Sequence, residues 1–299
     1  MSNLTDLISA GGGGSEVNDN KVINSNANSI TTESGEVWLR SGVLSTDTTT
    51  YPNATGLLSG ATYTNTNWST GGQVAIPSGI TWDGSFFYVC DRYSNGSVYK
   101  YSSTGTYTNS SFTSNGSENM GLMWDGTYFY MGESNGGYVY RYNSSFTLQN
   151  WSITGVSGVQ GVAVIGSVIY VLRANGYIYA FNITSTGGTA SHNINTAGQL
   201  GGAEQTLATD GQYLYAVSTS GVAYKYDPKS GGAGYLGISF SVNALSSTAI
   251  EYGGLAFKGT ELYSTNATDG KVFKFNEALS VGLGGKVESD GGTIYTRIK

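Results

Sequence analysis

Segments in which aromatic and polar side chains alternate recur along the middle of the chain. Tyr99 and Tyr101 flank Lys100, and the same spacing returns at Tyr140/Tyr142, Tyr179/Phe181, Tyr224/Tyr226 and Phe273/Phe275. Side chains two residues apart lie on one face of a β-strand, so this pattern predicts short strands with an aromatic face. A glycine-containing pair precedes each strand, as at Asn135-Gly136 and Asn175-Gly176, which predicts tight hairpin turns.

A second pattern, seven residues long, shows that these strands belong to a repeat. Trp82-Asp83-Gly84-Ser85-Phe86-Phe87-Tyr88 is nearly copied 42 residues later at 124–130, and weaker copies end on Tyr170, Tyr215 and Tyr263. Each copy predicts an inner strand A, the Asp-Gly turn, a strand B with the tyrosine, a hairpin turn, strand C and an outer strand D. The outer strands carry bulky residues five apart, as at Tyr107 and Phe112.

Four antiparallel strands in a repeat of this length are typical of a blade of a β-propeller. The fifth copy lacks its outer strand, whereas the segment from Tyr63 to Ser69 resembles an outer strand without a blade. We therefore predict an all-β, five-bladed propeller over residues 58–278, closed by an N-terminal outer strand. The alternative is a sixth blade built from residues 36–56 and the C-terminal tail.

Composition and charge argue against several classes of partner and cofactor. The chain has 45 glycines, 23 tyrosines, 11% charged residues and a formal net charge of −6. This balance offers no dense cationic surface, so we expect no nucleic-acid partner and no anionic membrane partner. A single cysteine and a single histidine leave no set of ligands for a structural zinc ion, and we expect no metal and no cofactor.

The two ends of the chain differ from the repeat. Residues 1–35 contain four consecutive glycines and many Asn, Ser and Asp residues, which predicts a flexible linker or anchoring segment. Residues 36–57 are expected to form a small β attachment segment that pairs with residues 279–299. No basic stretch followed by an apolar core begins the chain, and no window is apolar enough to span a membrane, so we expect neither a signal peptide nor membrane insertion.

These ends resemble segments of a known class of proteins. The stretch from Val37 to Ala54, with Trp38-Leu39-Arg40-Ser41-Gly42 and Thr46-Asp47-Thr48-Thr49-Thr50-Tyr51-Pro52, is similar to a segment of tailed-bacteriophage virion proteins. The final Ile294-Tyr295-Thr296-Arg297-Ile298-Lys299 resembles their usual C-terminus, and the first residues resemble phage tail and fibre proteins. The resemblance covers about 60 residues outside the propeller. It implies a virion protein, a tail fibre or other appendage, whose ends attach a variable module.

Candidate ligand-binding residues lie where propellers bind ligands, on the face built from the B–C turns and the D–A connections. The connections contribute Glu118, Gln160, Glu204 and Glu251, and the turns contribute Asp91, Arg92, Tyr93, Glu133, Arg173 and Asp269. Carboxylates beside two arginines are suited to a polar glycan or a cation, or to the acid and base of a glycosidase. The alternative is that these residues are solvated loop charges.

Three functional hypotheses follow. The first is a noncatalytic virion protein, made in the host without a signal peptide. It contacts other virion proteins through residues 1–57 and 279–299 and forms a homo-oligomer. Its propeller is presented to host-surface polysaccharide. The second is a polysaccharide-degrading glycosidase. The third is a capsid decoration or spacer protein.

Overall fold

The fold comes from a computed structural model, which describes residues 29–31, 37–41, 58–93, 96–200, 204–229, 231–242, 253–259, 261–279, 288–290 and 293–298. The chain divides into two compact units. One unit is Ser59–Ala278, and the other joins Met1–Leu58 to Leu279–Lys299.

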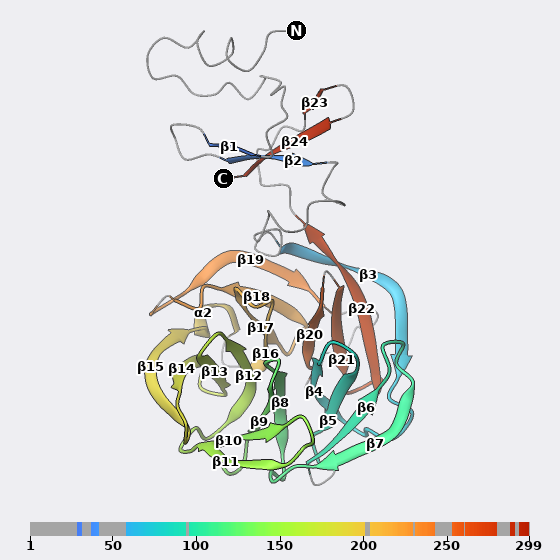
Figure 1. The fold of residues 1–299 in the computed structure, drawn as a ribbon, viewed down its shortest axis with the longest axis vertical. Coiled ribbons are helices and arrows are strands. Elements are labelled where there is room, and N and C mark those ends of the chain that lie inside the picture. The colour runs from blue at the N-terminus through green and yellow to red at the C-terminus, as the bar shows by residue number, and fades with distance from the viewer. Residues whose placement is uncertain are drawn as a thin grey trace. The chain divides into compact units, whose positions relative to one another are not determined.

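The larger unit holds five four-stranded antiparallel sheets that follow one another around a ring (Figure 1). The predicted five-bladed β-propeller is thereby confirmed, and the six-bladed alternative is not observed. Blade 1 contains β4 (Pro77–Trp82), β5 (Phe87–Asp91), β6 (Ser97–Tyr101) and β7 (Tyr107–Thr113). Blade 2 contains β8 (Asn119–Trp124), β9 (Tyr128–Glu133), β10 (Tyr138–Asn143) and β11 (Leu148–Ile153).

The remaining blades have the same strand order. Blade 3 contains β12 (Val159–Ile165), β13 (Val168–Arg173), β14 (Tyr177–Ile183) and β15 (Gly188–Asn195). After the short helix α2 (Ala197–Leu200), blade 4 contains β16 (Glu204–Thr209), β17 (Leu214–Ser218), β18 (Val222–Tyr226) and β19 (Tyr235–Ser241). Blade 5 contains β20 (Leu255–Lys258), β21 (Glu261–Asn266), β22 (Lys271–Leu279) and, from the N-terminal side, β3 (Leu58–Ser69).

The repeated Asp-Gly pair forms the turn between the first two strands of a blade. Asp83 Oδ1 accepts hydrogen bonds from the backbone amides two and three residues further on, and Gly84 has a φ of 100°, which suits glycine. The hydroxyl of Tyr88 donates to Asp83 Oδ2 at 2.9 Å, and Tyr215 bonds Asp210 in the same way at 2.7 Å. The aspartate therefore fixes both the turn and the tyrosine of strand B.

The inner strands of neighbouring blades approach one another so closely that most of them carry glycine at the contact. A Cβ atom added at this position would lie 2.2–2.9 Å from a backbone nitrogen of the next blade's inner strand, nearer than Cβ atoms pack. Gly79 faces the nitrogen of Leu122, Gly121 that of Val162, Gly161 that of Leu207, and Gly254 that of Ile80. In blade 4 the buried Thr206 takes this place.

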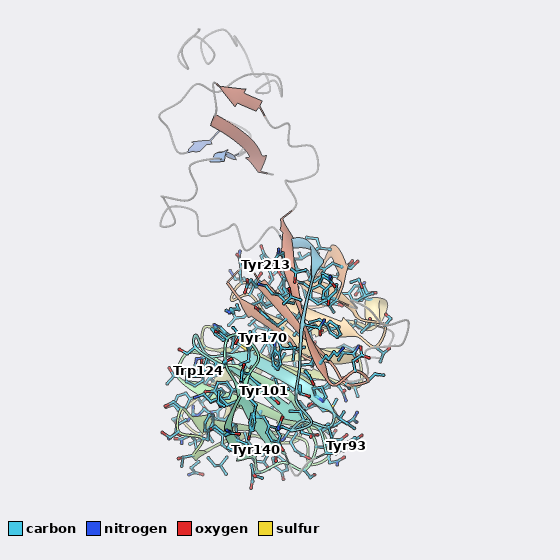
Figure 2. The ribbon with its side chains drawn as sticks, turned by 90° about the vertical axis from the view of Figure 1, so that its right-hand side faces the viewer. Tyr93, Tyr101, Trp124, Tyr140, Tyr170 and Tyr213 are labelled. Atoms are coloured by element: carbon cyan, nitrogen blue, oxygen red, sulfur yellow. The ribbon has the colours of Figure 1, made fainter. Side chains whose placement is uncertain are left out.

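Buried hydrophobic clusters fill the interfaces between neighbouring blades, and aromatic side chains such as Tyr101, Trp124 and Tyr170 belong to them (Figure 2). Tyr88 of blade 1 packs edge-on against Phe129 of blade 2 with ring centroids 4.8 Å apart, and Phe87 packs against Tyr263 of blade 5 at 4.5 Å. A cation covers several of these clusters, as where Lys258 Nζ lies 4.6 Å from the centre of the Trp82 ring. Blades are therefore joined by packing of hydrophobic and aromatic side chains rather than by hydrogen-bonded strands.

The five-residue spacing in the outer strands places the two bulky side chains against different neighbours. In β7, Tyr107 lies opposite Tyr101 and Phe112 lies opposite Val98, with a bulge between them. Tyr107 packs into the cluster shared by blades 5 and 1, whereas Phe112 stacks on Phe146 of blade 2 at 4.1 Å. Each aromatic therefore anchors one face of the outer strand.

The ring is closed by β3, which completes blade 5. Thr70, just after β3, donates to the carbonyl of Gly270 through both its amide and its hydroxyl, at 3.0 Å each. Trp68 packs on Tyr101 of blade 1 with ring centroids 4.8 Å apart, and Gly105 lies against the indole where no Cβ would fit. The strand that closes blade 5 therefore also joins it to blade 1.

The smaller unit contains a four-stranded sheet built from both ends of the described chain. Its strands are β1 (Ser29–Thr31), β2 (Val37–Ser41), β23 (Glu288–Asp290) and β24 (Thr293–Ile298), in the order β1-β2-β24-β23. β2 and β24 pair antiparallel, with Val37 opposite Ile298 and Ser41 opposite Ile294. Most of the predicted linker over residues 1–35 and of the segment over residues 36–57 lies outside the described residues.

The glycine contacts generate a first prediction. Gly121→Ala should lower the free energy of unfolding by about 2 kcal/mol, because the added methyl group must displace the inner strand of blade 3. Urea unfolding followed by tryptophan fluorescence measures the change. Gly198→Ala in α2, where an added Cβ meets nothing within 4 Å, is the control and should change stability by less than about 0.5 kcal/mol. Equal effects of the two variants would contradict the steric explanation.

The closing strand generates a second prediction. Trp68→Ala should destabilise the protein by about 3 kcal/mol, because it leaves a cavity between blades 5 and 1. Trp68→Phe should retain most of the stability, since the indole Nε1 is buried without a hydrogen-bond partner in the described structure and its loss costs little. Thermal unfolding of the three proteins tests this order, and a Phe variant as unstable as the Ala variant would contradict it.

Candidate functional site

The last residue of strand B is a polar side chain that holds the following B–C turn in several blades. Asp91, Glu133, Ser218 and Asn266 occupy this position. Each accepts a hydrogen bond from a backbone amide of its own turn or, for Ser218, from the amide of the first residue after the turn. An acceptor that satisfies turn amides fixes a loop that strand pairing alone leaves free. Part of the predicted ring of polar residues therefore serves the turns themselves.

Asp91 holds two segments of blade 1 together. Its Oδ1 accepts from the amide of Tyr93 at 3.2 Å, and its Oδ2 accepts from the amide of Ala75 at 2.7 Å, in the connection that precedes β4. The side chain is completely buried. Both oxygens are thus engaged by the backbone.

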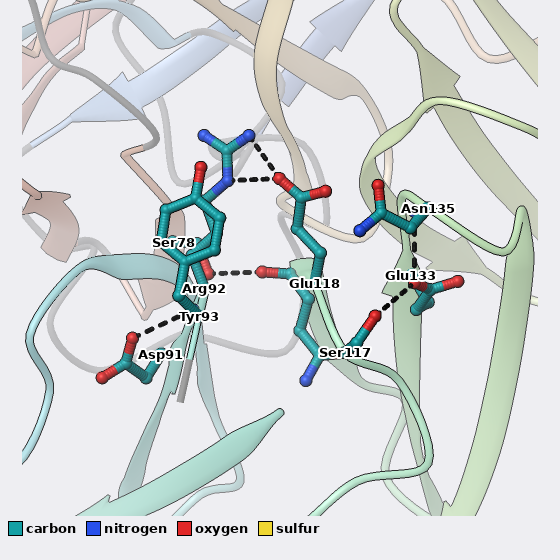
Figure 3. A network of polar contacts seen from close by, with 9 residues as sticks. Ser78, Asp91, Arg92, Tyr93, Ser117, Glu118, Glu133 and Asn135 are labelled. Atoms are coloured by element: carbon teal, nitrogen blue, oxygen red, sulfur yellow. Dashed lines mark hydrogen bonds and ion pairs between the residues drawn. The ribbon is translucent and has the colours of Figure 1, made fainter. Parts of the chain in front are cut away.

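Glu133 has the corresponding place in blade 2. Its Oε1 accepts from the amide of Asn135 at 3.1 Å and from the hydroxyl of Ser117 at 3.5 Å. Its Oε2 accepts from the amide of Gly136 at 2.5 Å. Glu133 therefore ties the B–C turn of blade 2 to the connection that enters the same blade, as Figure 3 shows.

Arg92 and Glu118 form the ion pair at the centre of this region (Figure 3). Arg92 Nε donates to Glu118 Oε1 at 2.7 Å, and Nη2 lies 2.5 Å from the same oxygen. Both side chains are nearly nine-tenths buried. The pair links the B–C turn of blade 1 to the connection between blades 1 and 2.

Tyr93 differs from its neighbours because the residue is 55% exposed. The guanidinium carbon of Arg92 lies 4.8 Å from the ring centre, so the cation supports the ring. Figure 3 shows Tyr93, Arg92 and Glu118 together, with Glu133 and Asn135 on the adjoining turn of blade 2. The structure thus brings five predicted residues to one place: Asp91, Arg92, Tyr93, Glu118 and Glu133.

The other predicted residues lie elsewhere. Arg173 ends β13 in blade 3, where it donates to the carbonyl and the hydroxyl of Ser157 at 2.8 and 2.9 Å and covers the ring of Tyr179. Asp269 is exposed in the B–C turn of blade 5, and its amide donates to Asn266. The side chain of Glu204 and all of Glu251 lie outside the described residues.

Two residues of this region were not selected from the sequence. Ser117 and Asn135 are exposed and lie on the connection and the turn that Glu133 joins. Asn135 precedes the turn glycine, and from the sequence this position indicates only a hairpin turn. The sequence signal that points to Asn135 is its position in the B–C turn of blade 2, one repeat after the turn of blade 1 that contains Tyr93.

Among the described residues, no group of three or more His, Cys, Asp or Glu side chains is arranged to hold a metal ion. No helix in this part of the chain has the length and apolar character needed to cross a bilayer.

Comparisons with known proteins support the fold. No family model matches the chain, and no curated protein matches its sequence. The crystal structure of Myxococcus xanthus glutaminyl cyclase is similar, with a TM-score of 0.58 and 11% identity over 73% of this chain and 96% of that one. A chain in a structure of the mitotic checkpoint complex aligns with a TM-score of 0.44 and 13% identity over 67% of this chain and 63% of that one, which supports no inference. The likeness to the cyclase is one of fold alone.

Cys90 gives a prediction about pH and access. Its thiol is completely buried, accepts from the amide of Gly79 at 3.1 Å and has its pKa raised to about 11, chiefly by burial. The folded state therefore holds the thiol proton more tightly than the unfolded state. The resulting stability is complete below about pH 9 and is lost as the pH rises toward 11, by about 2 kcal/mol at pH 11.

Cys90→Ala should not show this alkaline loss of stability. The difference in free energy of unfolding between the unchanged protein and the variant should therefore change between pH 9 and 11. Denaturant titrations at pH 8 and pH 10.5 measure the difference, and the tyrosines, whose ionisation also destabilises the fold in alkali, are common to both proteins. Ellman's reagent should label native Cys90 at pH 8 only as fast as the protein opens. Immediate labelling would contradict the burial argument.

Proposed function

We propose that this chain is a structural protein of a tailed-phage virion, in which the two ends attach a β-propeller that contacts polysaccharide on the host surface. One observation carries the proposal. The two segments that resemble phage virion proteins, far apart in the sequence, contain strands β2 and β24, which pair in one sheet of a compact unit other than the propeller. Such a division is suited to an attachment element that carries an exchangeable module.

The propeller suits the second half of the proposal. Its blades are fixed to one another by buried hydrophobic clusters, so loops from separate blades keep their relative positions on a rigid support. Tyr93 and the polar groups around it are presented by such loops. A rigid surface loses little conformational entropy on binding, which favours attachment to a polysaccharide that offers weak contacts.

The positions of the carboxylates favour binding over hydrolysis. A glycosidase needs one carboxyl group as acid and a second as base or nucleophile. Asp91 and Glu133 have both oxygens engaged by backbone amides, and Glu118 is paired with Arg92. We therefore place the glycosidase hypothesis second. We also propose that residues 1–57 and 279–299 contact other virion proteins and that the protein forms homo-oligomers, in a tail appendage rather than a capsid decoration.

Mass spectrometry of purified phage particles tests this proposal. The polypeptide should be present, and deletion of residues 293–299, which removes β24, should abolish its incorporation while the propeller still folds. Tyr93→Ala, which leaves both ends unchanged, is the control and should be incorporated at the normal level. Particles that lack the polypeptide, or that incorporate the deletion variant normally, would contradict the proposal.

A further inference from the structure

We propose that the surface between blades 1 and 2 binds one neutral pyranose residue, which stacks on Tyr93 and donates a hydroxyl hydrogen bond to Glu118. This inference rests on the proposed function, because it specifies the class of glycan that the propeller recognises. We call this place the Tyr93 surface and define it by Tyr93, Arg92, Glu118 and Asn135. Three of these four residues belong to the ion pair and ring contact shown in Figure 3.

The ring of Tyr93 provides an aromatic platform. Tyr93 is the most exposed large hydrophobic residue in the described structure, at 55%. Its amide donates to the buried Asp91, and the Arg92 guanidinium lies against its ring. The ring is thus accessible while Arg92 supports it, and the C–H face of a pyranose is the kind of apolar, flat surface that packs on such a ring.

Glu118 provides an oriented acceptor. Arg92 Nε and Nη2 both approach Oε1, whereas no hydrogen bond within the described residues reaches Oε2. The residue is 92% buried, since its exposed fraction is 8%, and the guanidinium holds it in place. An ionised carboxylate oxygen in such a position forms a short, strong hydrogen bond with a hydroxyl group.

Asn135 adds a donor and an acceptor next to Glu118. The amide of Ser134 donates to the carbonyl of Glu118 at 2.9 Å, so the turn that contains Asn135 is fixed beside the ion pair. Asn135 is exposed, and its side-chain amide makes no hydrogen bond in the described structure. Adjacent sugar hydroxyls both donate and accept, which is the pattern that an amide can match.

Charge decides between neutral and acidic sugars. Asp91, Glu118 and Glu133 bring three carboxylates to this region against the one guanidinium of Arg92, and the chain as a whole has a formal charge of −6. A uronic or sialic acid would add a further negative charge and be repelled. A neutral pyranose meets the platform and the acceptor without that repulsion.

The test uses the full chain, labelled with a fluorophore, on an array that holds neutral hexose oligosaccharides and matched oligosaccharides containing uronic or sialic acids. Neutral oligosaccharides should bind and the acidic ones should not. Tyr93→Ala and Glu118→Gln should each weaken binding to the best neutral oligosaccharide by about tenfold or more, whereas Tyr93→Phe should keep it. Leu236→Ala, an exposed apolar residue of β19 in blade 4, is the control and should bind normally.

Thermal unfolding of each variant separates lost binding from lost folding, and calorimetric titration with the selected oligosaccharide gives the affinities. Binding to neutral sugars that survives Tyr93→Ala, preference for acidic sugars, or no binding to the array would each overturn the inference. Incorporation of the chain into virions is measured independently. A virion protein that binds no neutral glycan would therefore refute this inference while leaving virion assembly supported.

Discussion

The close approach of the inner strands is the constraint on which the rest of the propeller depends. Four of the five blades place glycine where the next blade's backbone comes nearest, and a single methyl group there would meet a nitrogen at 2.2–2.9 Å. Strands this near the centre leave little space for side chains, so the aromatic core is displaced outward to the faces between blades. Most of the tyrosines and phenylalanines that join the blades therefore belong to strands B and C and to the outer strands, where the blades diverge, although Phe257 of the inner strand β20 also packs on Tyr215 of blade 4.

The same geometry explains why polar groups accompany the aromatic rows. Tyr88 and Tyr215 send their hydroxyls to the turn aspartates of their own blades, while Lys100 and Lys225 lie over neighbouring rings at 3.8 and 4.0 Å. Blade 3 has Ile165 and Ala180 at the corresponding positions, and the hydroxyl of Tyr170 donates instead to the carbonyl of Pro228 in blade 4 at 3.3 Å. Acid and cation are absent together from this blade, which indicates that they act as one polar cluster around the tyrosine.

The blade count, the order of strands and the N-terminal closure could be predicted from the sequence. The repeat occurs in five copies, and the fifth copy lacks an outer strand that the N-terminal segment can supply. Local signals such as Asp83-Gly84 and the tyrosine pairs agree with the global fold, which makes such a prediction robust. The candidate site was harder to predict from the sequence. Sequence position placed Asp91 and Glu133 at the correct end of their strands, but it does not show that their oxygens point back to turn amides. The ion pair of Arg92 with Glu118 joins residues 26 positions apart whose contact depends on how two blades pack.

Closure by β3 also has a consequence for the order in which the protein is made. Residues 58–69 leave the ribosome before every other strand of the propeller, whereas their partner β22 spans Lys271–Leu279. The first strand of the propeller to be synthesised must therefore wait, with an unpaired edge, until β22 has emerged. Its sequence, rich in Thr and Asn with Asn65 at a φ of 60°, is polar and interrupted, which suits a segment that has to avoid other edges during translation.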